Sequence, residues 1–141
     1  MNPDELDYFS VALSLDQIRA LSSIALAHLG DAVYEVLVRT WLCVHGKATG
    51  KTLHKATVAL VCANKQAALS ERILPLLTPE EADVFRRGRN ANVHTIPHSA
   101  GHAEYRQATA LEALFGYLYL AGRKARVNEL FTRMMEEDDG T

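Results

Sequence analysis

The sequence has few cysteines, no long apolar run and no basic leader segment. Its two cysteines, Cys43 and Cys62, fit neither a metal site nor a redox pair, which favours reduced thiols in a cytosolic protein. No apolar run approaches the roughly 18 residues that a membrane span needs. The acidic start MNPDELDYF is unlike a signal peptide. We therefore expect a cytoplasmic protein with no disulfide scaffold and no membrane partner.

Aromatic residues are also scarce, at 7% of the 141 residues, but apolar residues reach 48% and charged residues 23%. This composition is ordinary for a globular protein, and the length suits one domain. We expect residues 1–141 to form a single domain, with a core at about 17–135 and acidic termini.

Charge is unevenly distributed, although the formal net charge is only −2. Four acidic residues precede the first basic one, and four more lie at 136–139. Between residues 17 and 135, nine acidic residues stand against fifteen basic ones, an excess of six positive charges. A positive body with acidic ends favours a polyanionic partner, but acidic ends that serve solubility give the same pattern. Charge alone leaves both interpretations open.

Apolar residues recur at helical spacing, and no strand-like alternation is present. Ser14 and Gln17 form a candidate capping box, and Thr78 before a proline marks another helix start. Gly88 and Gly122 are expected to end helices. The pattern predicts an all-α bundle with helices at 15–21, 22–44, 52–76, 79–87, 103–121 and 123–136, and with loops at 45–51 and 88–102.

Two of these helices carry a lone acidic residue close to a glycine inside an apolar segment. Gly30 and Asp31 interrupt one helix, and Glu112 precedes Gly116 by one turn in another. Glycine in a helix interior costs about 1 kcal/mol relative to alanine, which indicates a close crossing where the carboxylates converge. Two unpaired buried carboxylates are unfavourable, and a divalent cation such as Mg²⁺ or Mn²⁺ would stabilise them. Pairing with arginine or capping of a neighbouring helix is the alternative.

The residues around these acids resemble the ribonuclease III family. Leu29–Val33 (LGDAV) is similar to the core of the family's signature motif, and Ala110–Gly116 (ALEALFG) is similar to its second acidic motif, whose glutamate is a metal ligand. The segments 25–35, 85–91 and 116–120 together resemble mini-ribonuclease III, a short bacterial form without a double-stranded-RNA-binding domain. The resemblance covers about residues 20–135, and three motifs in order make it specific.

The resemblance implies a ribonuclease III-like catalytic domain in which Asp31 and Glu112 are catalytic ligands of Mg²⁺, with Mn²⁺ as a substitute. Two acidic positions of the larger enzymes are occupied here by Ala27, four residues before Asp31, and by Thr109, three before Glu112. Glu35, one turn after Asp31, is a candidate further metal ligand or a partner of a surface arginine. A two-acid site leaves more of the metal's coordination shell to water or phosphate, so we expect weak Mg²⁺ binding until RNA is bound.

Basic residues form one dense and one looser group of candidate RNA contacts. Arginine binds phosphate oxygens through paired N–H groups, and A-form RNA is recognised mainly through its backbone and 2′-hydroxyls. The dense group follows the helix 79–87 and comprises Arg86, Arg87, Arg89 and Asn90. The looser group includes Lys55, Asn64 and Lys65. Capping of a helix C-terminus and ordinary solvated surface are the respective alternatives.

Histidines and aromatic residues give weaker signals. His94, His98 and His102 recur every four residues, but a proline and a glycine interrupt any helix there, so we expect contacts with RNA or solvent rather than zinc. The aromatic residues expected in the core or at a dimer interface are Tyr34, Trp41, Tyr117 and Tyr119.

The resemblance implies a Mg²⁺-dependent endoribonuclease that cleaves double-stranded RNA and leaves 5′-phosphate ends. A metal held by Asp31 and Glu112 could activate water and stabilise phosphoryl charge. The resemblance implies a homodimer that matures the ends of precursor 23S ribosomal RNA, with a ribosomal protein presenting the RNA. The alternatives are a catalytically silent RNA-binding or ribosome-associated module of the same fold, and a helical protein-interaction adaptor.

Overall fold

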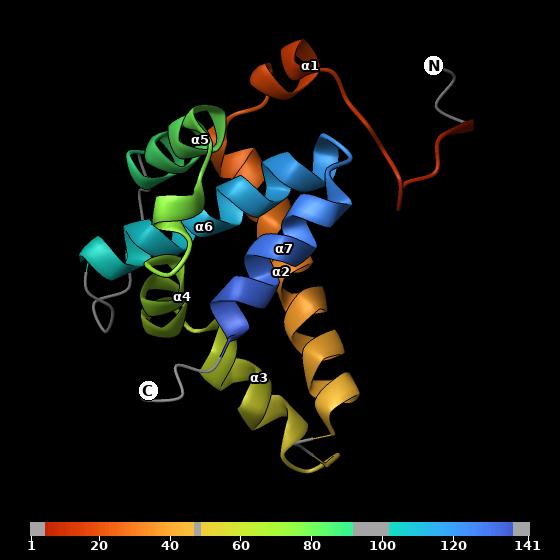
Figure 1. Cartoon of the computed structure of the whole chain (residues 1–141), viewed down its shortest axis with the longest axis vertical. Coiled ribbons are helices and arrows are strands. Elements are labelled where there is room, and N and C mark those ends of the chain that lie inside the picture. Colours follow the sequence, from red (N-terminus) through yellow and green to blue (C-terminus); the bar gives the residue numbers. More distant parts are fainter. Residues whose placement is uncertain (1–4, 47–48, 92–101, 137–141) are drawn as a thin grey trace.

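The computed structural model describes residues 5–46, 49–91 and 102–136 (Figure 1). The regular elements in these ranges are α1 (Leu15–Arg19), α2 (Ser23–His45), α3 (Leu53–Val61), α4 (Ala63–Ser70), the 3₁₀ helix η2 (Leu74–Leu76), α5 (Pro79–Arg89), α6 (His102–Leu120) and α7 (Lys124–Met135). The predicted all-α class is confirmed. None of the helices in the described ranges has the length and apolar character that crossing a lipid bilayer requires.

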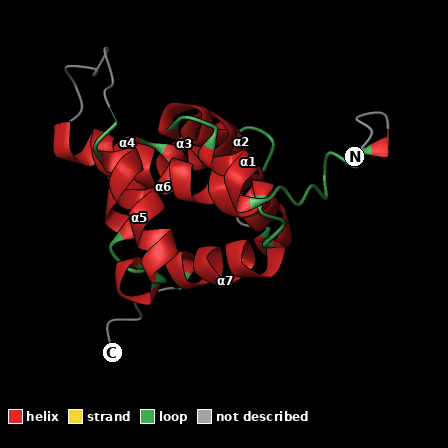
Figure 2. Cartoon of the chain, turned by 90° about the horizontal axis from the view of Figure 1, so that it is seen from above, coloured by secondary structure: helices red, strands yellow, loops and turns green. Residues whose placement is uncertain are grey.

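Helix α6 lies at the centre of the fold, with α2, α4, α5 and α7 packed around it (Figures 1 and 2). The ring of Tyr34 on α2 lies 6.0 Å from Phe115 on α6 and 6.1 Å from Phe131 on α7. Aromatic contacts therefore join three helices. The apolar side chains of α6 that are fully buried include Leu111, Leu114, Phe115 and Leu118.

The predicted close crossing of two helices is confirmed between α2 and α6. A Cβ atom placed at Gly30 would overlap the backbone carbonyl of Glu112, and one placed at Gly116 would overlap the backbone carbonyl of Leu26. Since the obstructing atoms belong to the backbone, no rotation of a side chain could make room. Glycine is therefore required on both helices at the crossing.

The single helix predicted over residues 52–76 is wrong, because the chain leaves helical geometry at Cys62 and separates α3 from α4. Cys62 has φ −66° and ψ 153°, which is extended backbone. The Tyr34 hydroxyl donates to the Leu60 carbonyl at 3.0 Å, and Gln66 Nε2 donates to the Val61 carbonyl at 2.8 Å. These bonds satisfy carbonyl groups that end a helix and otherwise need water.

Most helix ends follow the predicted signals. Ser14 and Thr78 both form complete capping boxes, and Gly122 ends α6 in the left-handed region at φ 74°. The expectation that Gly88 ends a helix is wrong, because α5 continues to Arg89. Gly88 is buried against α6, where an added Cβ would lie 2.9 Å from the Cβ of Ala113. Its role is to let α5 approach α6.

Candidate active site

The α2–α6 crossing brings together the two acidic side chains that the sequence singles out. Asp31 follows the glycine of α2, and Glu112 supplies the carbonyl against which that glycine packs. The two carboxyl groups are linked by a hydrogen bond. Asp31 is exposed and Glu112 is partly buried. The pair therefore lies at the edge of the crossing, where solvent and a ligand can reach it.

Burial is the main cause that raises the pKa of Glu112 to about 8. The negative charge of Asp31 and the hydrogen bond to it raise this pKa further, whereas a hydrogen bond with Gln66 lowers it. Without a metal, the pair therefore holds a proton on Glu112 at neutral pH. A divalent cation bound between the carboxylates would displace that proton and take over its role in offsetting their repulsion.

The donor chemistry of the pair fits a hard cation, because carboxylate oxygens are the ligands that Mg²⁺ and Mn²⁺ prefer. Within the described ranges, no group of three or more His, Cys, Asp or Glu side chains is placed to hold a metal. A cation here would complete its coordination with water or phosphate oxygens. The positions of the two absent family acids contribute no charge, since Ala27 is buried and the Thr109 hydroxyl donates to the Tyr105 carbonyl at 3.1 Å.

Glu35, the candidate further ligand, forms an ion pair with Arg39 at 3.4 Å along the surface of α2. This arrangement favours its alternative role as the partner of a surface arginine. In the described part of the chain, by contrast, neither carboxyl group of the central pair is bridged to a lysine, arginine or histidine. Pairing with arginine, the alternative to a metal for Asp31 and Glu112, is therefore not found among these residues.

Gln66, which the sequence analysis missed, is 2% exposed and faces this pair from α4. Its neighbours Asn64 and Lys65, which were considered as RNA contacts, are both exposed at the start of the same helix. Apolar periodicity gave no sign of Gln66, because it reaches the site through the break at Cys62, and the pattern had predicted an unbroken helix there.

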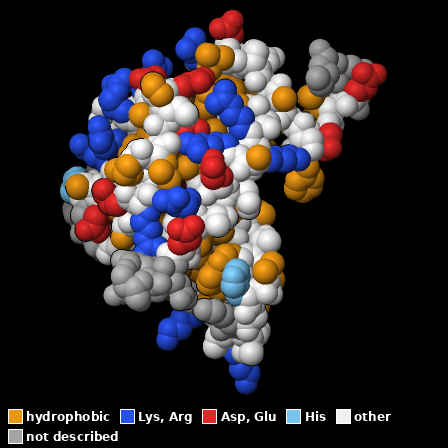
Figure 3. Space-filling model, in the orientation of Figure 1, with side chains coloured by type: hydrophobic (Ala, Val, Ile, Leu, Met, Phe, Trp, Pro, Cys, Tyr) orange, Lys and Arg blue, Asp and Glu red, His pale blue; other side chains and the backbone are white. Residues whose placement is uncertain are grey.

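The predicted basic cluster lies on the outer side of α5, where Figure 3 shows Lys and Arg side chains gathered with acidic ones among them. Arg86 and Arg87 both bind Asp83, at 2.6 and 3.0 Å. Arg89 and Asn90 are exposed at the end of the helix. Because Gly88 fixes α5 against α6, these side chains keep a set position relative to the helix that carries the buried acid. Lys55 is exposed on α3.

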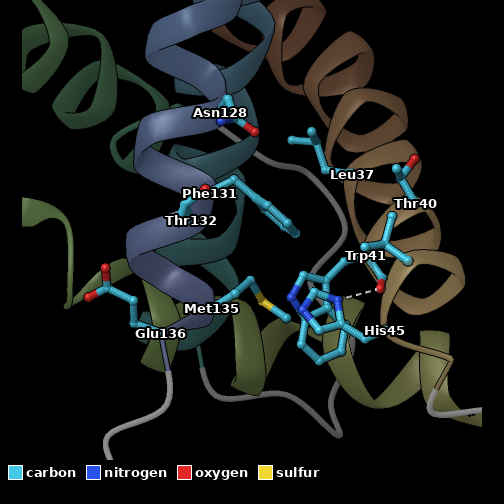
Figure 4. Close-up of a pocket in the computed structure, with 10 residues that line it drawn as sticks. Leu37, Thr40, Trp41, His45, Asn128, Phe131, Thr132, Met135 and Glu136 are labelled. Atoms are coloured by element: carbon cyan, nitrogen blue, oxygen red, sulfur yellow. Dashed lines mark hydrogen bonds between the residues drawn. The ribbon is translucent and has the colours of Figure 1, made fainter.

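The other aromatic and histidine predictions have different outcomes. Tyr34 and Tyr117 are buried in the core, and Tyr119 is partly buried. Trp41 is half-buried and stacks on His45 with ring centroids 4.2 Å apart, in a groove of about 390 Å³ between α2 and α7 (Figure 4). His102 is exposed at the first residue of α6, whereas His94 and His98 lie outside the described residues.

An all-helical fold with a glycine-lined crossing and paired acids is the architecture expected for a ribonuclease III-type catalytic domain. The chain matches the family model of the ribonuclease III domain over residues 24–123. It belongs to the ribonuclease III family, in the mini-ribonuclease III group, and is an endoribonuclease.

The similar proteins span most of the chain. It is 47% identical to the Mini-ribonuclease 3 of Symbiobacterium thermophilum, over 78% of this chain and 85% of that protein. It is 53% identical to the Mini-ribonuclease 3 of Gloeobacter violaceus, over 76% and 78% of the two chains. A crystal structure of a protein from Fusobacterium nucleatum superposes with a TM-score of 0.77 at 32% identity, covering 85% of this chain and 98% of that one.

Proposed function

We propose that this endoribonuclease is Mg²⁺-dependent and cleaves double-stranded RNA, with Asp31 and Glu112 holding the metal. The observation that carries the proposal is the meeting of these two carboxyl groups at an accessible edge, without a basic side chain of the described residues between them. When bound, Mg²⁺ supplies charge stabilisation for the scissile phosphate and activation of the attacking water. Mn²⁺ has the same ligand preferences and is expected to substitute.

The side chains of the chain hold the metal and the substrate rather than attack the phosphate themselves. Glu112 would hold the metal in its deprotonated form, and exposed Asp31 would be the second ligand at the solvent side. Water is the nucleophile. The resemblance to ribonuclease III implies that the bond from phosphorus to O3′ is the one that breaks, which leaves 5′-phosphate and 3′-hydroxyl ends. No nucleophilic serine or cysteine is needed in this scheme.

Duplex RNA would bind through its backbone along the exposed basic cluster of α5. Asp83 holds Arg86 and Arg87 in place, so less side-chain freedom is lost when these guanidinium groups meet phosphate oxygens. Arg89 and Asn90 extend the cluster beyond the end of the helix. A second contact region would comprise the exposed side chains Lys55, Asn64 and Lys65.

A homodimer would place two such sites opposite the two strands of a duplex. A second groove of about 390 Å³, distinct from the one at Trp41, supports this proposal. It is apolar, and the residues that line it include Leu29, Ala32 and Val33, which are close to Asp31 in the sequence. Two apolar side chains at this groove, Phe9 and Val36, are 81% and 62% exposed, and exposed apolar patches of this kind mark interaction surfaces. The proposed occupant is a second copy of the chain.

The proposed substrate is precursor 23S ribosomal RNA, trimmed at its ends in the cytoplasm, with a ribosomal protein presenting the RNA. The resemblance to mini-ribonuclease III supports this assignment.

The test is incubation of the pure protein with an end-labelled RNA duplex, with and without Mg²⁺, beside the Asp31→Asn variant. We expect cleavage only by the wild-type protein and only with the metal. Salt-sensitive binding without cleavage under any metal condition would instead support the silent RNA-binding module.

A further inference from the structure

Gln66 is a buried polar side chain next to the proposed metal site. The two acids of that site do not by themselves explain why a glutamine is buried there. The residue is 2% exposed, and its Oε1 atom is buried without a hydrogen-bond partner in the described part of the structure. A buried acceptor left unpaired destabilises a fold. An apolar side chain of similar size would avoid that cost. The presence of glutamine here therefore indicates that its amide N–H groups have a role.

The amide of Gln66 lies between the end of α3 and Glu112 of α6. Its Nε2 donates to the Val61 carbonyl at 2.8 Å, at the end of α3. Its side chain also favours the charged form of Glu112 by hydrogen bonding, which lowers the pKa of that carboxyl group. The break at Cys62 allows both contacts, because it turns the end of α3 towards the first turn of α4. Gln66 therefore links a fixed backbone carbonyl to the carboxyl group of the buried acid.

Glu112 has few other restraints on its orientation. Its backbone is fixed by the contact with Gly30, but its side chain retains rotatable bonds beyond the helix. Ala27 and Thr109 place no further carboxylate at the site. Among the described residues, the other hydrogen bond of the carboxyl group is with Asp31, which would itself turn towards a bound cation.

We propose that Gln66 is a positioning residue of the metal site, whose amide holds the Glu112 carboxylate in the orientation that shares a divalent cation with Asp31. The inference rests on the proposed metal-dependent function. An amide N–H suits this task because it donates to the charged carboxylate and carries no charge that would repel the metal. Its cost is the unpaired buried oxygen at the opposite end of the amide.

The test compares Gln66→Met with a matched control, Gln107→Met. Methionine has a similar length but no N–H donor. Gln107 also bridges α4 and α6, donating to Ser70 Oγ and Glu71 Oε1 at 3.1 Å each, with no contact to the acid pair. Mn²⁺ binding is measured without RNA by electron paramagnetic resonance, and thermal unfolding is measured in EDTA.

We expect Gln66→Met to bind Mn²⁺ about tenfold more weakly than wild type, and Gln107→Met to bind within about twofold of it. Raising the Mg²⁺ concentration should restore the cleavage rate of Gln66→Met, because Glu112 itself is intact. If Gln66 has a purely structural role, Gln66→Met should lower the unfolding temperature in EDTA and leave the Mn²⁺ affinity unchanged. That result would overturn the proposal.

Two further outcomes separate this inference from the proposed function. If wild-type protein fails to bind Mn²⁺, the metal-dependent function is overturned, and this inference with it. If wild type binds and both variants bind equally well, only the positioning role fails. Should Gln66→Met not fold, Gln66→Asn carries the same test, since its amide is one methylene too short to bridge both partners. Wild-type affinity in that variant would refute the positioning role.

Discussion

Glu112→Gln should stabilise the metal-free protein while abolishing cleavage. The substitution keeps the size of the side chain and removes the carboxyl group whose charged form is disfavoured by burial and by Asp31. The folded protein binds this proton more tightly than the unfolded chain does. The stability of metal-free wild type therefore falls as pH rises from about 4.5 to about 8 and is level beyond that. The glutamine variant lacks this loss.

The size of the effect follows from the same pKa. At 1.36 kcal/mol per pH unit, a rise from 4.5 to about 8 sets a ceiling of about 5 kcal/mol on the destabilisation. Glu112 is only partly buried and Asp31 is exposed, so water reduces both the desolvation cost and the repulsion, and we expect about 1–2 kcal/mol at pH 8.5. For a chain of this length that corresponds to an increase of about 3–6 °C in unfolding temperature.

The assay is thermal unfolding in EDTA at several values between pH 5 and pH 8.5. The difference between variant and wild type should grow across this range. Glu104→Gln, which removes an exposed acid from the first turn of the same helix, is the control and should show no such growth. Adding Mg²⁺ should stabilise wild type but not Glu112→Gln. A stability difference that is the same at pH 5 and pH 8.5 would refute the argument that the carboxyl pair is strained by its own charge.

Three other predictions concern the metal, the RNA and the assembly. Mg²⁺ binding at pH 7 should release about one proton from Glu112. Calorimetry in two buffers of different ionisation enthalpy should therefore give different apparent binding enthalpies. Equal enthalpies would contradict the assignment of Glu112 as a metal ligand that is protonated in the metal-free protein. Arg87→Ala combined with Arg89→Ala should weaken duplex binding regardless of sequence and reduce the slope of log affinity against log salt by about 1–2. The control Arg133→Ala, on α7, should leave the slope unchanged, and an unchanged slope in the double variant would remove α5 from the interface. Hybrid dimers of wild-type and Asp31→Asn protomers should nick one labelled strand of a duplex; hybrids that cut both strands in one encounter would rule out one site per strand.

The crossing could be predicted from the sequence because its signals are local. Glycine next to Asp31 and one turn after Glu112 departs from ordinary helix composition, and both departures have the same cause in the structure. The helix starts were also predictable, since a capping box depends only on residues three apart.

The features that were missed depend on contacts between distant segments. The break at Cys62 is supported by the hydroxyl of Tyr34, 26 residues before the carbonyl that it binds, and no pattern within residues 52–76 contains that information. Gly88 has the usual position of a helix-ending glycine, but it is required by the approach of another helix. In both cases, tertiary packing overrides the local signal.

The contact of backbone with backbone at Gly30 and Gly116 has a consequence for how this enzyme can vary. The spacing of the two acid-bearing helices is fixed by main-chain atoms, so repacking the surrounding apolar side chains leaves the separation of the acids nearly constant. The core can therefore accumulate substitutions without moving the two acids of the proposed catalytic centre relative to each other. A methyl group added at either glycine would separate the helices and the acids together, so a single mutation there would damage folding and catalysis at once.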